Sequence, residues 1–230
     1  MMQRRGFLRL AGRSILATIV LAAFPGTAAL AASAAQTGDF FRAVQMDDPS
    51  TVKNLLAAGV NPNQPNPAGG EPALVLAVRE GAMRVLQVLL DNPGIQVDAP
   101  AVNGNTALMM AAFKRNRPAA EALIARGAVV NRPGWTPLHY AAASGDEDIA
   151  RLLIKRGAKL DAVSPPASGG FTPLMMAARE GQPDMAVFLV GQGANPQLKN
   201  TEAMTAVQIA EKANRADIAE AIRARQGKAR

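Results

Sequence analysis

The sequence predicts an all-α fold in which similar helical units stack into a solenoid, and three observations predict it. The 230 residues include 47 alanines, while aromatic residues make up only 4%. This composition suits close helix packing and suits strands poorly. A short motif recurs about every 33 residues, which is typical of repeat architectures. Each copy leads into an amphipathic apolar segment that usually ends at a glycine, as helices often do.

The first element along the chain is a predicted export signal at residues 1–34. It holds four arginines and no acidic residue, then an apolar run of 11 residues from Ser14 to Phe24, then small residues that allow cleavage after Ala31 or Ala34. An uncleaved membrane anchor is the alternative. Because the apolar run is shorter than the ~20 residues that span a bilayer, we expect cleavage, no stable membrane anchor and a periplasmic location.

The export route can be narrowed from the start of the signal. The stretch QRRGFLR from Gln3 to Arg9 resembles the twin-arginine export motif, although Gln3 stands where that motif usually has Ser or Thr. An ordinary Sec signal that carries adjacent arginines is the alternative, and both routes lead to the same compartment.

Six copies of one motif follow the signal. The clearest are GNTALMMAA from Gly104, GWTPLHYAA from Gly134 and GFTPLMMAA from Gly170, with two weaker copies and a degenerate first copy. Aligned on the threonine position, the copies are spaced by 34, 34, 30, 36 and 33 residues. The predicted repeats therefore span residues 38–71, 72–105, 106–135, 136–171, 172–204 and 205–230.

The residues that open each motif are suited to begin a helix. Threonine there can accept hydrogen bonds from free N–H groups, and proline is tolerated next because its position has no helical N–H partner. In the first copy, Asp39 is the candidate cap. Between the helices, Asp47, Arg115 and Asn214 replace the usual glycine. Asp and Asn tolerate the positive φ of such a turn, whereas Arg does so poorly, so the turn at Arg115 is either strained or reshaped. The motif residues predicted to hold the fold are Thr106, Thr136, Pro137, Leu138, His139, Thr172, Pro173 and Leu174.

The pattern T-P-L-H-x-A-A followed by L-L-x-x-G-A resembles the ankyrin repeat. The resemblance covers residues 38–227, and the full TPLH stands at Thr136–His139. It implies two antiparallel helices and a β-turn finger per repeat, with His139 joining neighbouring turns by hydrogen bonds. Compared with the second and fifth fingers, the third finger is three residues shorter and the fourth is three residues longer. Such changes often map to a binding face, but neutral drift in a solvent loop explains them equally well.

The composition excludes much chemistry. The chain has no cysteine and one histidine, so it cannot form a disulfide, a thiolate site or a multi-histidine metal site. It carries no phosphate-binding glycine motif. The formal charge of +7 falls to +3 without the four arginines of the signal, as 21 basic residues face 18 acidic ones. We therefore expect no catalytic residues, cofactor, metal, small-molecule substrate or nucleic-acid partner.

Recognition in ankyrin proteins uses a concave face built from the finger tips and the exposed ends of the first helices. Trp135, Phe171 and Phe113 map to this face and should be neighbours ringed by charge, a composition typical of binding hot spots. The alternative is that the aromatic residues only pack finger against finger. The predicted partner-binding residues are Trp135, Phe171, Phe113, Lys114, Arg79, Glu80, Arg179, Glu180, Asn105 and Met204.

These observations predict a monomeric, non-enzymatic module that is exported to the periplasm and binds a protein partner. The chain looks similar to small periplasmic ankyrin proteins of Gram-negative bacteria, some of which are linked to oxidative-stress defence. The alternatives are an accessory factor in that defence or an immunity protein that masks a toxin. A hydrolase or oxidant scavenger is the function that the residues support least, because no convergent polar site is evident.

Overall fold

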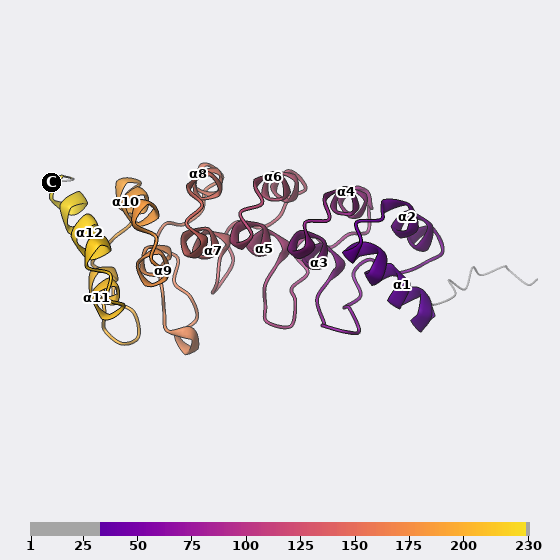
Figure 1. Ribbon diagram of the computed structural model, residues 1–230, viewed down its shortest axis with the longest axis horizontal. Helices are drawn as coiled ribbons and strands as arrows, with labels where there is room; N and C mark the ends of the chain where they lie inside the picture. The colour runs from indigo at the N-terminus through magenta and orange to yellow at the C-terminus, as the bar shows by residue number, and fades with distance from the viewer. Residues whose placement is uncertain (1–32, 229–230) are drawn as a thin grey trace, which may run out of the picture. The chain divides into compact units, whose positions relative to one another are not determined.

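A computed structural model describes residues 33–228 of the chain. Within this range the chain forms twelve α-helices, one 3₁₀ turn and no strand, and the helices pair off in sequence order (Figure 1). The predicted all-α fold of about six repeats is confirmed. Except for Ser33 and Ala34, the predicted export signal lies outside the described residues, and so does the cleavage site after Ala31, whereas the site after Ala34 lies at the start of the first α-helix. No helix within 33–228 is long and apolar enough to cross a membrane.

We call the earlier member of each pair the first helix and the later member the second helix. The loop that leads to the next pair is the finger, and the fourth finger contains η1 (Pro166–Ser168). The pairs are α1 (Ala34–Gln45) with α2 (Pro49–Ala57), α3 (Ala73–Glu80) with α4 (Met83–Asp91), α5 (Ala107–Phe113) with α6 (Arg117–Ala125), α7 (Pro137–Ser144) with α8 (Glu147–Lys155), α9 (Pro173–Glu180) with α10 (Pro183–Gly191), and α11 (Ala206–Lys212) with α12 (Ala216–Lys228).

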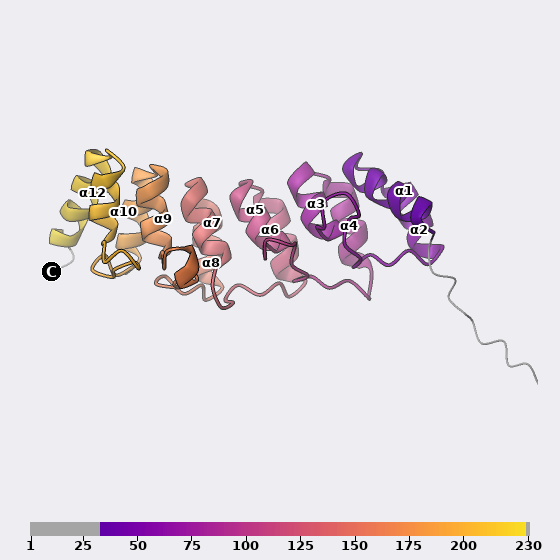
Figure 2. The ribbon, with the colours of Figure 1, turned by 90° about the horizontal axis from the view of Figure 1, so that it is seen from below.

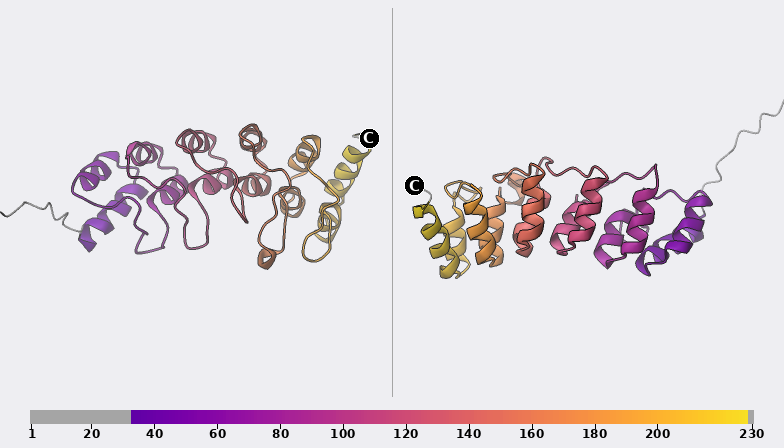
Figure 3. Two further views of the ribbon diagram at one scale, coloured as in Figure 1. Left: turned by 180° about the vertical axis from the view of Figure 1, so that it is seen from behind. Right: turned by 90° about the horizontal axis from the view of Figure 1, so that it is seen from above.

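The helices and fingers of residues 33–228 lie in three layers. Second helices form one row, first helices form the next, and the fingers extend beyond the first helices on the far side (Figures 1 and 3). Figure 2 views the same array from the finger side. The first helices α3, α5, α7 and α9 each pack on the next. We call the surface made by the fingers and the first helices the finger face.

The core follows the repeated motif. Leu108 and Leu138 are fully buried, and so are the alanine pairs that follow them in α5 and α7. Alanine leaves room for the neighbouring first helix, which is why the alanine-rich composition suits this stacking. Leu123 and Leu153 on the second helices are also fully buried. Truncating a leucine at such a site would cost roughly 2–5 kcal/mol of stability.

The helix starts confirm most of the expected caps. The hydroxyls of Thr106, Thr172 and Thr205 accept hydrogen bonds from the third helical N–H of their own helices. The start of α1 differs from the expectation. It begins at Ala34, and Ser33 caps it through a reciprocal pair of bonds with Gln36. The Asp39 prediction is wrong because that residue lies inside α1.

The turns between paired helices keep a positive φ where glycine is replaced, and this includes the turn at Arg115, which is not reshaped. Asp47, Arg115 and Asn214 have φ of 50°, 55° and 57°. Asp47 also joins two repeats, because its carboxylate accepts the Val85 N–H at 2.9 Å and the Arg84 Nε at 2.9 Å. Helix α4 has no side-chain cap of its own, so this carboxylate from the preceding repeat takes that role.

The long fourth finger is held at both ends. Ser164 donates its N–H to the Phe171 C=O at 2.8 Å, and its hydroxyl accepts the Phe171 N–H at 2.9 Å. Thr201 of the fifth finger donates both its N–H and its hydroxyl to the Gly169 C=O at 3.1 Å. The added residues therefore form an ordered loop that fixes the position of Phe171.

Candidate functional site

His139 is a structural residue at the base of the finger face. Its Nδ1 accepts the Thr136 N–H at 3.1 Å and lies 2.9 Å from the Thr136 hydroxyl, while Nε2 lies 2.9 Å from the Phe171 C=O. Since Nδ1 accepts, Nε2 carries the proton and donates to that carbonyl, which joins the third and fourth fingers. Burial lowers the pKa of His139 from 6.5 to about 4, so the ring is neutral near pH 7.

Three aromatic rings stand beside His139. Trp135 lies edge-on to His139, with ring centroids 5.2 Å apart. Tyr140 contacts Trp135 at 6.3 Å and Phe113 at 6.4 Å between centroids, both edge to face, a favourable geometry for aromatic pairs. Phe113 is 52% exposed, so much of its ring surface is open to a ligand. These rings form one wall of a recess.

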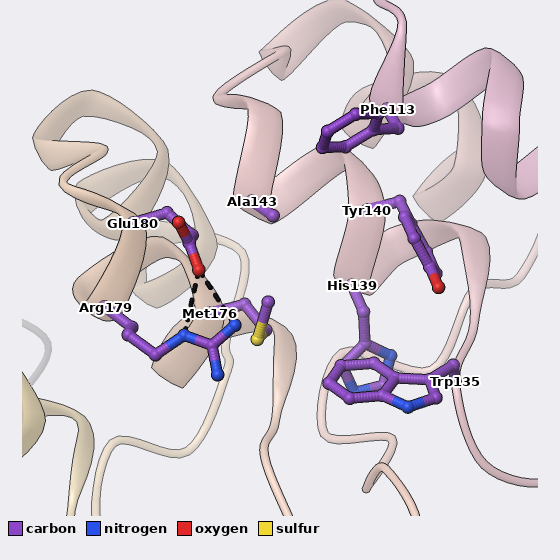
Figure 4. Close-up of a pocket in the computed structure, with 8 residues that line it drawn as sticks. All are labelled: Phe113, Trp135, His139, Tyr140, Ala143, Met176, Arg179 and Glu180. Carbon is purple, nitrogen blue, oxygen red and sulfur yellow. Dashed lines mark hydrogen bonds and ion pairs between the residues drawn. The ribbon is translucent and has the colours of Figure 1, made fainter. Parts of the chain in front are cut away.

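An ion pair forms the opposite wall (Figure 4). Arg179 donates to the same Glu180 oxygen from Nε at 2.9 Å and from Nη2 at 2.8 Å. The guanidinium also lies over the Phe171 ring, 4.7 Å from its centroid. The recess has a volume of about 280 Å³. We call it the aromatic pocket, and it is lined by Phe113, Trp135, His139, Tyr140, Ala143, Met176, Arg179 and Glu180.

A second recess of about 450 Å³ lies between the second and third repeats. Glu71 is 7% exposed, and its Oε1 lies 2.6 Å from Arg79 Nη1. Arg79 Nη2 lies 2.8 Å from Glu80 Oε1. Val75 and Met110 contribute apolar surface. Two carboxylates face one guanidinium, which leaves a formal charge of −1. We call this recess the acidic pocket.

The two pockets meet through one hydrogen bond. Tyr140, which lines the aromatic pocket, donates its hydroxyl to the Asn105 Oδ1 at 2.5 Å, and Asn105 lines the acidic pocket. Burial raises the pKa of Tyr140, so the hydroxyl keeps its proton and donates. The pockets therefore form one continuous stretch of the finger face.

The structure brings most of the predicted binding residues to these pockets. Phe113, Trp135, Arg179 and Glu180 line the aromatic pocket, and Arg79 and Asn105 line the acidic one, with Glu80 bonded to Arg79. Trp135 and Phe113 line the same pocket, whereas Phe171 is not in its lining and lies beneath Arg179, which is. Lys114 and Met204 line neither pocket.

Sequence reasoning missed three further residues that shape these pockets. Tyr140 and Met176 occupy the position directly after the histidine position of the motif, and Met110 occupies it in the third repeat. Non-alanine residues of varying type at this position are the signal that could have found them. Glu71 aligns with Trp135 and Phe171, but its role was also missed, since its pairing with Arg79 depends on how the finger returns to the first helix.

The arrangement offers contact surface. Within residues 33–228, no group of three or more His, Asp or Glu side chains could hold a metal ion. His139 has both ring nitrogens engaged, and the Arg179–Glu180 pair satisfies its own charges. The pockets therefore present aromatic ring surface and methionine thioethers to a ligand. Their formal charges differ.

Comparison with known proteins agrees with the helical pattern. A family model described as ankyrin repeats matches three overlapping stretches, residues 40–133, 97–164 and 128–200. The chain is 35% identical over 118 residues to human transient receptor potential cation channel subfamily A member 1. It is 36% identical over 126 residues to mouse SH3 and multiple ankyrin repeat domains protein 1. These matches cover 50% and 53% of this chain but only 10% and 6% of the two relatives.

Among solved structures, one similar chain comes from the Bd0816 predatory endopeptidase of Bdellovibrio bacteriovorus in complex with immunity protein Bd3460. The TM-score is 0.69 at 27% identity, and the match covers 80% of this chain and 96% of that one. The family model spans well over half of the sequence. The helix pairs, the fingers and the TPLH contacts follow the pattern that the ankyrin-repeat resemblance implies. This chain belongs to the ankyrin-repeat family.

Proposed function

We propose that the protein is a non-enzymatic module that is exported to the periplasm and binds a protein partner through the finger face. The observation that carries the proposal is the aromatic pocket, where Trp135, Tyr140 and the half-exposed Phe113 face the Arg179–Glu180 pair. Large aromatic residues and arginine dominate the binding energy of protein interfaces. Ankyrin repeats are typically interaction modules without enzymatic activity, and this supports the proposal.

Affinity capture from periplasmic extract tests the interface. The double variant Trp135→Ala/Phe171→Ala should lose the proteins that the wild-type chain recovers, because the first change removes ring surface from the aromatic pocket and the second removes the ring beneath Arg179, which lines that pocket. The matched control is Phe188→Ala. Phe188 also lies under an arginine, with Arg151 4.6 Å from its ring centroid, but on the second helix α10. Equal recovery by wild type and the double variant would refute the proposed interface.

Export is tested separately by cell fractionation. The mature chain should be found in the periplasm, and replacing Arg4 and Arg5 by lysine should block export if the twin-arginine route is used. Export that survives this change would assign the chain to the Sec route. Retention of the unprocessed protein in the cytoplasm of wild-type cells would overturn the location itself.

A second candidate function is that of an immunity protein that masks a toxin. The observation that favours it is the likeness to a chain from an endopeptidase–immunity protein complex. In this case the captured partner would be a lytic enzyme, and adding the purified protein would inhibit it. An inhibitory effect that disappears with Trp135→Ala/Phe171→Ala would support the candidate, and a captured partner that is not inhibited would exclude it.

A further inference from the structure

We propose that the partner presents an aromatic side chain to the aromatic pocket and a lysine or arginine side chain to the neighbouring acidic pocket. The inference rests on the proposed function and specifies the chemistry of the segment that the finger face takes. It follows from the contents of the two pockets, from their different charges and from their contact through one hydrogen bond.

The aromatic pocket selects an apolar ring. The Tyr140 hydroxyl, both His139 nitrogens and the Arg179–Glu180 pair already have hydrogen-bond partners. An aromatic ring can enter the pocket without displacing any of these bonds. It would meet the edges and faces of Trp135 and Tyr140 and the thioether of Met176, which are favourable contacts for an aromatic group.

The acidic pocket selects a long cationic side chain. Glu71 in the lining and Glu80 beside it share Arg79, so these three side chains together carry a formal charge of −1 that a partner cation would neutralise. A lysine or arginine stem would lie along Met110 and the exposed Val102 while its charged end approaches the Glu71–Arg79–Glu80 group. A partner carboxylate at the same place would add a third negative charge to the group.

The contrast between the pockets comes from one aligned position. The second and fifth repeats carry the same Arg-Glu pair, Arg79–Glu80 and Arg179–Glu180, at the ends of α3 and α9. In each repeat the arginine also contacts the residue before the threonine position. That residue is Glu71 in the second repeat and Phe171 in the fifth. One repeat thereby gains a buried carboxylate and the other a stacked ring, so the same pair yields one anionic and one neutral recess.

The pockets are close enough for one segment to fill both. Met110, Tyr140 and Met176 occupy the same motif position in the third, fourth and fifth repeats. Met110 lines the acidic pocket, and Tyr140 and Met176 line the aromatic pocket. The Tyr140–Asn105 hydrogen bond lies between the recesses. A short peptide segment that crosses this bond would therefore place one side chain in each.

Selection from a phage-displayed random dodecapeptide library tests the proposal on the purified protein. Counter-selection uses Trp135→Ala and, as a second variant, Phe113→Ala, whose half-exposed side chain can be truncated without opening the core. We expect the peptides that survive to combine an aromatic residue with a lysine or arginine. Enrichment of acidic peptides, of peptides without an aromatic residue, or of none that depend on Trp135 or Phe113 would overturn the proposal.

Synthetic copies of the enriched peptides then separate the two pockets. Trp135 is the only tryptophan of the chain, so its fluorescence reports occupancy of the aromatic pocket when the peptide lacks tryptophan. Changing the peptide's aromatic residue to alanine should weaken binding by about tenfold or more. Changing its basic residue to glutamate should weaken binding by about fivefold, and Glu80→Gln should reduce that preference.

Glu180→Gln is the matched control, because Glu180 pairs with its arginine in the same geometry but lies in the neutral pocket. It should leave the preference for a basic peptide in place. Equal loss of the preference in both variants would refute the assignment of the cation to the acidic pocket. If capture of a partner depends on Trp135 but the selected peptides lack the aromatic and basic residues, the inference fails and the proposed function stands. If the peptides carry both residues but capture of a partner does not depend on Trp135, only the proposed function is rejected.

Discussion

At the scale of single residues, His139 shows how the TPLH motif links two fingers. Its ring is fully buried and bonds Thr136 on one side and the Phe171 C=O on the other. In the fifth repeat Met175 stands at the same position, and its sulfur receives only the Thr172 N–H at 3.4 Å. The link from a first helix to the following finger is therefore stronger in the fourth repeat than in the fifth.

Stability should fall as the pH drops from about 6.5 to about 4, and His139 should account for part of the fall. In the unfolded chain the ring binds a proton near its ordinary pKa of 6.5, whereas in the folded protein the pKa is about 4. The contribution is therefore complete above pH 6.5 and is lost at lower pH, up to about 3 kcal/mol. Urea unfolding of wild type and His139→Met over this range measures it. Identical pH slopes in the two proteins would contradict the prediction.

Restoring histidine in the fifth repeat should stabilise the protein. In Met175→His, Nε2 would reach the Met204 C=O, the counterpart of the Phe171 C=O, and we expect a gain of about 1 kcal/mol. The matched control is Met109→His, whose acceptor would be the Trp135 C=O in the third finger. Because that finger is three residues shorter, its gain should be smaller. Thermal unfolding compares the two, and a larger gain for Met109→His would contradict the argument.

At the scale of elements, Asp47 couples the first repeat to the second. Burial alone would raise the pKa of Asp47, but hydrogen bonds from Val85 and Arg84 outweigh it and lower the pKa. Asp47→Gly relieves the positive φ yet removes the cap of α4, so we expect a net loss of about 1 kcal/mol. Asn214→Gly, at the equivalent turn of the last repeat, should change stability by about zero. Chemical denaturation measures both, and a stabilised Asp47→Gly protein would show that the cap contributes little.

Helix α1 bears on the processing of the proposed export signal. Cleavage after Ala31 keeps Ser33 and its capping bonds with Gln36, while cleavage after Ala34 removes the cap. Caps of this kind contribute about 1 kcal/mol. We therefore predict that the mature chain begins at Ala32. Intact-mass measurement of the periplasmic protein tests this, and a chain that begins at Ala35 would show that α1 does without its cap.

At the scale of the whole molecule, the repeat pattern is predictable from the sequence because it is local. Threonine caps, prolines, alanine pairs and closing glycines recur along the chain, and their spacing alone locates the helix pairs. The pockets are only partly predictable. The motif places Trp135 and Arg179 on one face, but the place of Tyr140 between Trp135 and Phe113, and of Arg179 over Phe171, depends on how neighbouring repeats rotate against each other. The start of α1 is not predictable from the repeat pattern because no motif precedes it.

The measurement that tests the central claim most directly is ¹⁹F NMR of protein labelled with 5-fluorotryptophan. The chain has one tryptophan, Trp135, so the label gives a single resonance inside the aromatic pocket. We predict that this resonance shifts or broadens on addition of the unlabelled captured partner, in proportion to the complex formed. An unchanged resonance in a sample that forms the complex by size-exclusion chromatography would show that the partner binds elsewhere.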